Sequence, residues 1–265
     1  KSHNTKLGYI FSAIGIKIGD KLSNSPLFIF FTGRIFNLIL SIIIIFIAIK
    51  IIPKYKEILL SVATIPMFIQ EMASYSYDSV VNTFSLLILA IIIKMIYDKK
   101  VKWVLKTIIL LILGIFIANI KMIYLPIYLF ILLVPNDKFK KWYYKYLYCF
   151  GLIVGAYLLN NLLNAKVFFN NGISSNVIVS NPNLELIKNN PLSLFSIAYY
   201  TIKFETAFYA RSLFAYFGWF TFRFQDILIF AFIIYNLYLL ANNNKLEGKW
   251  FDKLIILIGL LLGVA

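Results

Sequence analysis

The chain is poor in the residues that build disulfide frameworks and common zinc sites. Among its 265 residues there is one cysteine, Cys149, and one histidine, His3. A disulfide framework needs paired cysteines, and the usual zinc sites need several Cys and His ligands. Both kinds of site are therefore excluded, and the cysteine content does not indicate a redox compartment.

Charged residues are also scarce, because Asp, Glu, Lys and Arg make up 14% of the chain, whereas 61% is hydrophobic. The mean hydropathy of +0.83 is far above that of a soluble domain, and several apolar runs are long enough to cross a bilayer. This composition predicts an integral membrane protein. We expect an all-α fold, a polytopic transmembrane helical bundle.

Acidic residues are the rarer sign, 11 against 26 basic residues, which gives a formal net charge of +15. A basic chain can bind nucleic acid, but here the lysines lie in short clusters between apolar runs. Lysines in that position set membrane orientation and contact anionic lipid headgroups. We expect membrane lipids as partners and no nucleic acid.

Apolar windows of helical length predict the membrane segments. They fall at about 33–51, 58–73, 79–97, 103–119, 122–135, 144–163, 226–241 and from 253 onward. The chain opens on Lys1 rather than a methionine and stops at Ala265 inside an apolar run. We therefore expect a single transmembrane domain over 1–265 that is incomplete at both ends.

The connections between these windows alternate in charge. Lysines are concentrated at 50–57, 98–102, 136–141 and 242–253, whereas the connection around Glu71 and Asp78 has no basic residue. The positive-inside rule places the lysine-rich connections in the cytoplasm. The Glu71–Asp78 loop, the turn at Lys121 and the long segment 164–225 would then face outward.

Within the outward segment, residues 190–220 are apolar but contain Lys203, Glu205 and Arg211, which would make a membrane span costly. We expect one or two helices lying in the membrane interface instead. Their aromatic anchors would be Tyr199, Tyr200, Phe204, Tyr209, Tyr216 and Trp219.

The stretch "QEMASYSYDSVVN", residues 70–82, carries two carboxylates between apolar windows. In one interpretation Asp78 is only the N-cap of the following helix, and the run around Tyr75 is an interfacial turn. In the other, Asp78 and Asn82 share one helix face, and Glu71 on the opposing helix end completes an outward polar cavity. The two interpretations are compatible.

Two cations also allow more than one interpretation, whereas one glycine pair indicates helix packing. Arg34 opens the first complete span and Lys121 lies at an outward turn, so each is either a membrane anchor or a contact for a phosphate. Lys121 could also pair with Glu71. The spacing of Gly151 and Gly155 favours close helix packing.

Four blocks follow one another along the chain: "SAIGIKIGDKLSNSPLFIFFTGRIFNLIL" (12–40), "IPMFIQEMASYSYDSVVN" (65–82), "KMIYLPIYLFILLVPNDKF" (121–139) and an outward segment with "NNPLSLF" and "FGWF". Their order resembles a bacterial family of multi-spanning membrane proteins related to the GT-C glycosyltransferases. The resemblance covers most of the chain. It implies a GT-C-like bundle in the cytoplasmic membrane of a bacterium.

The resemblance also implies an activity: transfer of a sugar from a polyprenyl-phosphate donor to a cell-envelope glycan or lipid acceptor on the outer face of the membrane. Asp78 and Glu71 would be the catalytic carboxylates, although the main base of such enzymes would lie before Lys1. The substrate-binding residues would be Arg34, Lys121, Tyr75, Asn82 and Tyr124.

No cofactor is required by this scheme, and a divalent metal is an option. The competing functions are a transporter or flippase of lipid-linked glycans and a non-catalytic subunit of an envelope-assembly complex. Outward polar and aromatic segments favour the enzyme, whereas charges confined to the middle of the membrane would favour transport. The sequence leaves the oligomeric state open.

Overall fold

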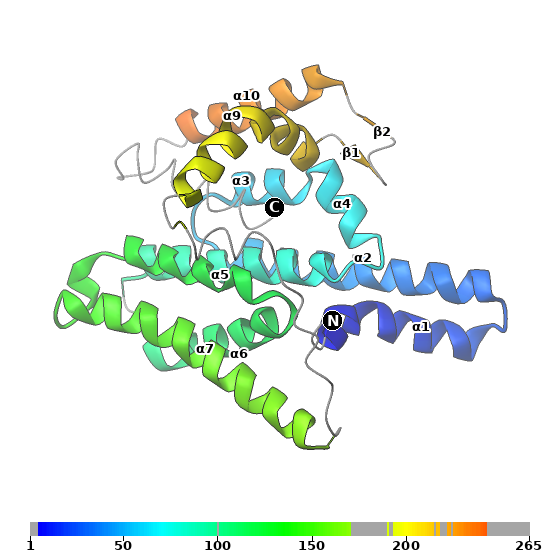
Figure 1. The fold of residues 1–265 in the computed structure, drawn as a ribbon, viewed down its shortest axis with the longest axis horizontal. Coiled ribbons are helices and arrows are strands. Elements are labelled where there is room, and N and C mark those ends of the chain that lie inside the picture. The colour runs from blue at the N-terminus through cyan, green and yellow to red at the C-terminus, as the bar shows by residue number, and fades with distance from the viewer. Residues whose placement is uncertain are drawn as a thin grey trace.

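The computed structural model describes residues 5–99, 101–170, 190, 193–214, 216–217, 222–223 and 225–242. Figure 1 shows that helices make up nearly all of this part, with a single pair of two-residue strands, β1 (Tyr216–Phe217) and β2 (Phe222–Arg223), which are antiparallel. The expectation of an all-α polytopic bundle is confirmed.

The helices follow one another along the chain with short connections. The α-helices are α1 (Ile10–Leu22), α2 (Pro26–Ile51), α3 (Lys56–Ala63), α4 (Pro66–Met72), α5 (Asp78–Tyr97), α6 (Trp103–Lys121), α7 (Tyr143–Asn170), α9 (Ser193–Phe214) and α10 (Asp226–Asn242). The 3-10 helices are η1 (Thr5–Tyr9), η2 (Met122–Leu133) and η3 (Asn136–Lys138).

Four stretches are long and apolar enough to span a membrane: Pro26–Ile51, Asp78–Tyr97, Trp103–Leu133 and Tyr143–Leu163. The third is not a straight rod. The Tyr128 hydroxyl donates a hydrogen bond to the Leu110 carbonyl, so η2 folds back along α6 after a turn at Lys121. The two separate windows predicted at 103–119 and 122–135 match this reversal.

The single window predicted at 58–73 is wrong, because the chain breaks there into α3 and α4. Pro66 has no N–H and disfavours helical backbone at the residue before it. Ile65 accordingly has φ −55° and ψ 128°, and α4 begins at Pro66. The break lets α4 end above the start of α5 instead of crossing the membrane.

The outward segment is only partly described. Helix α9 covers most of the predicted interfacial stretch, and its Tyr199, Tyr200 and Phe204 side chains are exposed. Lys203 lies against the rings of Tyr199 and Phe204. Residues 171–189, Trp219 and the window from 253 onward lie outside the described residues, and the interfacial placement stays a prediction.

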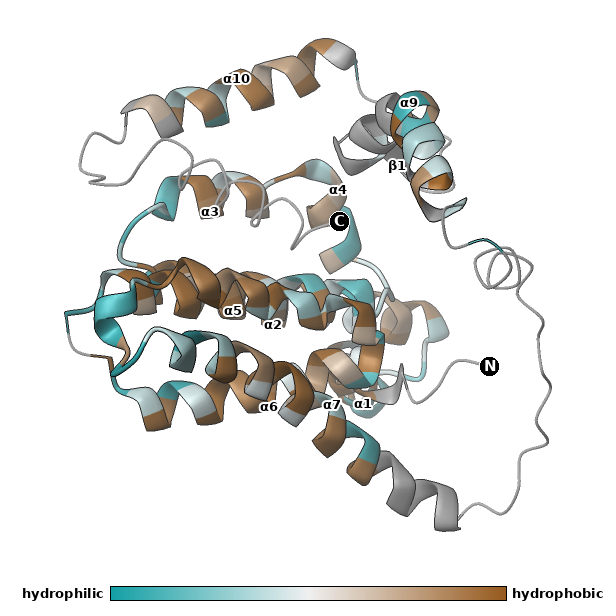
Figure 2. Ribbon diagram, turned by 60° about the vertical axis from the view of Figure 1, so that its left-hand side comes forward, coloured by the Kyte–Doolittle hydropathy of each residue, from teal (hydrophilic) through white to brown (hydrophobic). Residues whose placement is uncertain are grey.

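Helix α5 is the centre of the bundle, because most of its residues are buried between α2, α6 and η2. Figure 2 shows the hydrophobic middle of the helices with hydrophilic segments at both ends. One end, here called the lysine end, holds the connections α2–α3, α5–α6 and η2–α7. The other, the carboxylate end, holds the α4–α5 loop and the turn after α6.

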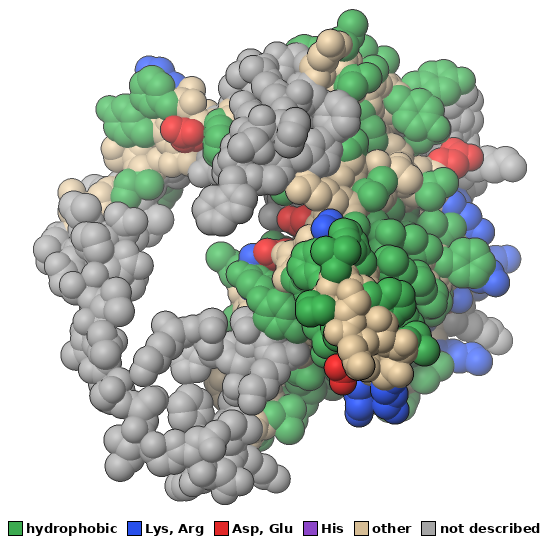
Figure 3. All heavy atoms as spheres, turned by 90° about the vertical axis from the view of Figure 1, so that its right-hand side faces the viewer, with side chains coloured by type: hydrophobic (Ala, Val, Ile, Leu, Met, Phe, Trp, Pro, Cys, Tyr) green, Lys and Arg blue, Asp and Glu red, His purple; other side chains and the backbone are tan. Residues whose placement is uncertain are grey.

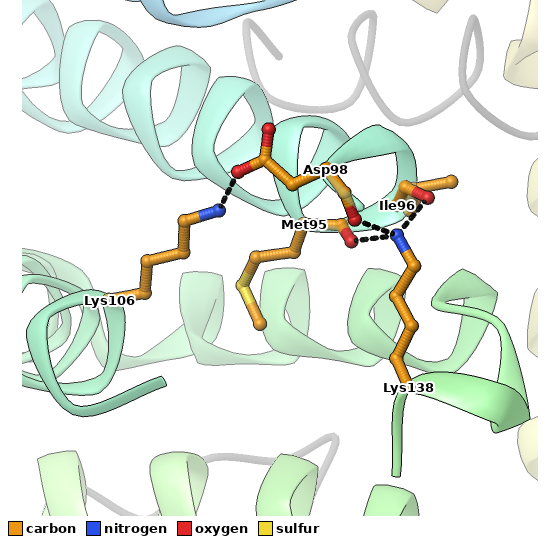
Figure 4. A network of polar contacts seen from close by, with 5 residues as sticks. All are labelled: Met95, Ile96, Asp98, Lys106 and Lys138. Atoms are coloured by element: carbon orange, nitrogen blue, oxygen red, sulfur yellow. Dashed lines mark hydrogen bonds and ion pairs between the residues drawn. The ribbon is translucent and has the colours of Figure 1, made fainter. Parts of the chain in front are cut away.

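At the lysine end, Lys138 closes the C-terminus of α5. Its ammonium group donates to the carbonyls of Met95, Ile96 and Asp98 at 2.8, 2.6 and 2.7 Å. Beside it the Lys106 ammonium pairs with the Asp98 carboxylate at 2.6 Å (Figure 4). The lysine-rich connections 50–57, 98–102 and 136–141 therefore gather at one end, as their alternation predicts.

Close packing of α1 on α2 depends on glycines of α1. A Cβ atom added to Gly15 would lie 2.6 Å from the Phe36 Cβ and 2.7 Å from the Thr32 carbonyl oxygen. Gly151 and Gly155, which have the same spacing as Gly15 and Gly19, are also expected to pack helices. A Cβ added to Gly155 would lie 3.2 Å from the Leu111 Cδ2, as expected, but one added to Gly151 meets nothing within 4 Å. The expectation for Gly151 is wrong, because that position faces open space.

Gly15→Ala should therefore destabilise the protein by about 1–3 kcal/mol, the usual cost of overpacking. Gly151→Ala is the matched control: it also replaces a helical glycine, without a collision, and should be neutral or stabilising by up to about 1 kcal/mol. Thermal unfolding of both variants in detergent micelles measures the difference. Equal effects of the two substitutions would contradict close packing of α1 on α2.

Candidate functional site at the carboxylate end

Two side chains of α2 bind the α4–α5 loop through hydrogen bonds. The Arg34 Nε donates to the Ala73 carbonyl at 2.6 Å, and the Asn37 amide donates to the carbonyls of Met72 and Ser74 at 3.0 and 2.7 Å. The last carbonyls of a helix lack partners within the helix and carry partial negative charge. Arg34 and Asn37 supply these partners, so α2 fixes the loop.

The loop itself is ordered by its serines. The Ser76 hydroxyl accepts a hydrogen bond from the Asp78 backbone N–H at 3.1 Å, and the Ser79 hydroxyl donates to the Ser76 carbonyl. The expectation that Asp78 is the N-cap is wrong: Tyr77 holds that position, and Asp78 is the first helical residue. The Ser76 hydroxyl also donates to the Asp78 Oδ2 at 3.5 Å, which leaves the Oδ1 of that carboxylate for another partner.

That carboxylate forms an ion pair with Lys121, at 2.5 Å between Oδ1 and Nζ. The two side chains are 25% and 32% exposed, so the pair remains accessible. The Lys121 ammonium also lies 5.0 Å from the Tyr77 ring and 5.8 Å from the Tyr124 ring. The partner of Lys121 is therefore Asp78, and the expected pairing with Glu71 is wrong.

Glu71 is partly buried on α4, outside the four candidate spans, and one carboxylate oxygen accepts a hydrogen bond from the Asn82 amide at 2.8 Å. Burial, followed by the negative charge of Asp78, raises the pKa of Glu71 to about 7. The Asn82 hydrogen bond and the Lys121 charge act in the opposite direction. Glu71 thus exchanges a proton near neutral pH.

Of the residues expected at the site, Glu71, Asp78, Asn82, Lys121 and Tyr124 come together from α4, α5, α6 and η2. Figure 3 shows acidic and basic side chains next to one another in the middle of this face, surrounded by hydrophobic ones.

Arg34 and Tyr75 lie on the α2 side of the same loop. The Tyr75 hydroxyl donates to the Phe30 carbonyl at 2.8 Å, and the Arg34 guanidinium lies 5.8 Å from the Phe30 ring. Of the Arg34 nitrogens, only Nε has a hydrogen bond to another described residue. The other two nitrogens keep their donors for a ligand.

Three residues of the site were missed from the sequence: Asn37, Ser76 and Ser79. Asn37 is buried and exchanges hydrogen bonds with the Ser79 hydroxyl. A signal existed, because Asn37 is a polar residue inside an apolar span, one turn after Arg34 and on the same helix face. The two serines carry no such signal, since serine is common in any turn.

The donor set does not fit a divalent cation. Within the described ranges, no group of three or more His, Cys, Asp or Glu side chains could hold a metal ion. Asp78 already neutralises Lys121, and Glu71 shares its carboxylate with Asn82. Two carboxylates engaged in this way leave too few oxygen ligands for Mg²⁺ or Ca²⁺.

Comparison with known proteins gave one match. The model of a family described as "Predicted membrane protein (DUF2142)" matches residues 4–265. No curated protein and no solved structure matches the chain.

The surroundings of Glu71 predict how its protonation responds to substitution. Asp78→Asn removes a negative neighbour, so the pKa of Glu71 should fall below 7, whereas Asn82→Ala removes the hydrogen bond to the carboxylate and should raise it. The infrared carbonyl band of the protonated acid, followed against pH, reports the midpoint. The band should be absent in Glu71→Gln and unchanged in the exposed control Glu57→Gln.

The folding equilibrium should follow the same titration. Because the pKa of Glu71 is raised from 4.5 to about 7, the folded protein holds a proton that the unfolded chain releases between these values. Its contribution to stability is fully present below pH 4.5 and is lost as the pH rises toward 7. A wild-type stability that rises over this interval relative to Glu71→Gln would contradict the assignment.

Proposed function

The chain belongs to the DUF2142 family of predicted membrane proteins, and we propose that it is a membrane glycosyltransferase of the GT-C type. It transfers a sugar from a polyprenyl-phosphate donor to a glycan or lipid acceptor of the cell envelope, on the outer face of the bacterial cytoplasmic membrane. One arrangement carries this proposal: Glu71, whose pKa is raised to about 7, lies with the Lys121–Asp78 ion pair at one end of the bundle, on the loop that Arg34 binds.

The two carboxylates have different roles in this reaction. A general base works best when its pKa lies near the working pH, which describes Glu71. Asp78 is held by Lys121 and fixes the position of that ammonium group. Glu71 is therefore the proton acceptor that this chain supplies, and Asp78 is a positioning residue.

The chemistry is a direct displacement at the anomeric carbon of the donor sugar. The acceptor hydroxyl gives its proton to the Glu71 carboxylate while its oxygen forms a bond to the anomeric carbon. The bond from that carbon to the phosphate oxygen breaks, and the polyprenyl phosphate leaves with the bonding electrons. Lys121 and Arg34 stabilise the negative charge that develops on the phosphate.

Arg34 is suited to a phosphate because its Nε is already anchored on the loop. The two terminal nitrogens can then bind two phosphate oxygens with little loss of side-chain freedom. Tyr75, Tyr124 and Asn82 border the same region and are the remaining candidates for contacts with the sugar or the acceptor.

The distribution of charge favours an enzyme over a transporter or flippase. Residues 35–49 of α2, 79–93 of α5 and 107–120 of α6 contain no Asp, Glu, Lys or Arg. A path for a charged glycan lipid through the membrane would need charged groups at that depth. The charged groups of these helices lie at their ends instead.

The proposal predicts the envelope glycans of a strain that lacks the gene. One sugar or linkage should disappear and return with the wild-type protein, but not with Glu71→Gln, at equal protein level in the membrane. Glu57→Gln, an exposed carboxylate at the lysine end, is the matched control and should restore the glycan fully. Unchanged glycans with lipid-linked precursor accumulating on the inner leaflet would instead indicate transport.

Arg34→Lys should retain the charge but lose two-point binding of phosphate. We expect transfer to fall by about tenfold, the loss of roughly one hydrogen bond to a charged group, with the KM for the donor raised. The measurement is sugar transfer from a synthetic polyprenyl-phosphate donor by purified protein. Unchanged kinetics in Arg34→Lys would leave Arg34 as an anchor of the loop only.

A further inference from the structure

The lysine end contains three adjoining hollows that the proposed reaction does not use. The largest is an apolar groove of about 660 Å³ between α6 and α7, lined by residues including Trp103, Thr107, Leu111, Leu147 and Gly151. It is open toward the membrane, because Val104 and Leu147 on its walls are 76% and 64% exposed. The open side of Gly151 noted above is part of this groove.

Two polar hollows continue from this groove. A hollow of about 510 Å³ shares Trp103 with the groove and contains Lys138 and Asp98. A second, of about 380 Å³, shares Asp98 and Lys99 with the first. The shared residues place the three hollows next to one another, in an order from apolar to basic surroundings.

The hollow of about 380 Å³, here called the basic hollow, is lined by more lysines than carboxylates. It is lined by Lys94, Lys99, Lys102 and Lys106 against a single carboxylate, Asp98. Lys106 pairs with Asp98. The ammonium groups of the other three lysines make no hydrogen bond or ion pair with any side chain in the described part of the α5–α6 region. Three cations therefore surround a space that suits an anion.

Aromatic rings lie where the apolar groove adjoins the polar hollows. The Trp103 ring lies 4.8 Å from the Phe139 ring and 5.3 Å from the Tyr148 ring, and the Tyr148 hydroxyl lies 2.9 Å from the Thr107 hydroxyl. Tryptophan and tyrosine concentrate at the depth of the lipid headgroups. The groove thus enters the hydrocarbon region where the basic hollow meets the headgroups.

We propose that this end of the protein binds an anionic phospholipid, with its phosphate on Lys94, Lys99 and Lys102 and one acyl chain in the α6–α7 groove. The positive charge of the lysines is complementary to a negatively charged headgroup. The apolar groove next to them is open to the membrane and can hold an acyl chain, so the ligand should carry such a chain beside its phosphate. Basic pockets between membrane helices bind such headgroups in general. The inference does not depend on sugar transfer.

Native mass spectrometry of the full chain tests this proposal, with phosphatidylglycerol and phosphatidylcholine of identical acyl chains as probes. Wild type should retain phosphatidylglycerol preferentially. The double variant Lys99→Ala with Lys102→Ala should bind it roughly thirtyfold more weakly, from the loss of two lysines near an anionic headgroup. Gly151→Leu should also lower retention, because Gly151 lines the groove and a Cβ at this position meets nothing within 4 Å, so the larger side chain would occupy the groove.

The matched control removes two other lysines of the same end. Lys140 and Lys141 are exposed and line none of the three hollows, so their double alanine variant should retain phosphatidylglycerol as wild type does. Equal losses in the two lysine pairs would overturn the proposal in favour of diffuse surface attraction. Unchanged retention in Gly151→Leu, or equal retention of both lipids by wild type, would overturn it as well.

Discussion

The last carbonyls of a helix have no partner within the helix, so they must find other donors where the helix ends against protein. The α4–α5 loop meets this requirement with Arg34 and Asn37, whose donors satisfy the carbonyls of residues 72–74. The position of Glu71 and Asp78 depends on these bonds, since both carboxylates flank the loop that α2 holds. A structural requirement of the backbone thereby places a cation and two carboxylates at one end of the bundle.

Helix α5 runs from the carboxylate end to the lysine end, and the charged side chains at its two termini are complementary to its helix dipole. Asp78 lies in its first turn, where the helix is partly positive, and Lys138 binds the carbonyls at its negative end. The dipole of α5 thus favours a carboxylate at its start and an ammonium group at its end, while each end of the bundle also holds charge of the other sign, Lys121 at the first and Asp98 at the second. Because the length of α5 separates the two ends, they can carry different ligands without competing: in the two proposals, a sugar donor at one and a phospholipid at the other.

The sequence predicts the helical bundle well because apolar windows depend only on local composition, but it fails where distant residues decide. The window 58–73 fails for a different reason: it averages over Pro66, whose effect on the helix is local and readable from the sequence. Asn37 binds residues 35 to 42 positions away, which no local pattern reveals. Serine and aspartate are both common N-cap residues, so the sequence alone does not tell which of Ser76 and Asp78 binds the backbone at the start of α5. The pairs Gly15/Gly19 and Gly151/Gly155 have equal spacing, and only the fold shows that Gly151 alone of these four does not face another helix.

The proposed reaction suits a site in which the cations are fixed before the substrate arrives. When Glu71 accepts the proton of the acceptor hydroxyl, its charge changes from −1 to 0, while the phosphate gains one negative charge as it becomes the leaving group. The total charge of the site is then the same before and after the transfer. Lys121, held by Asp78, and Arg34, held by Ala73, need not move to compensate, and such preorganised charges stabilise a transition state most effectively.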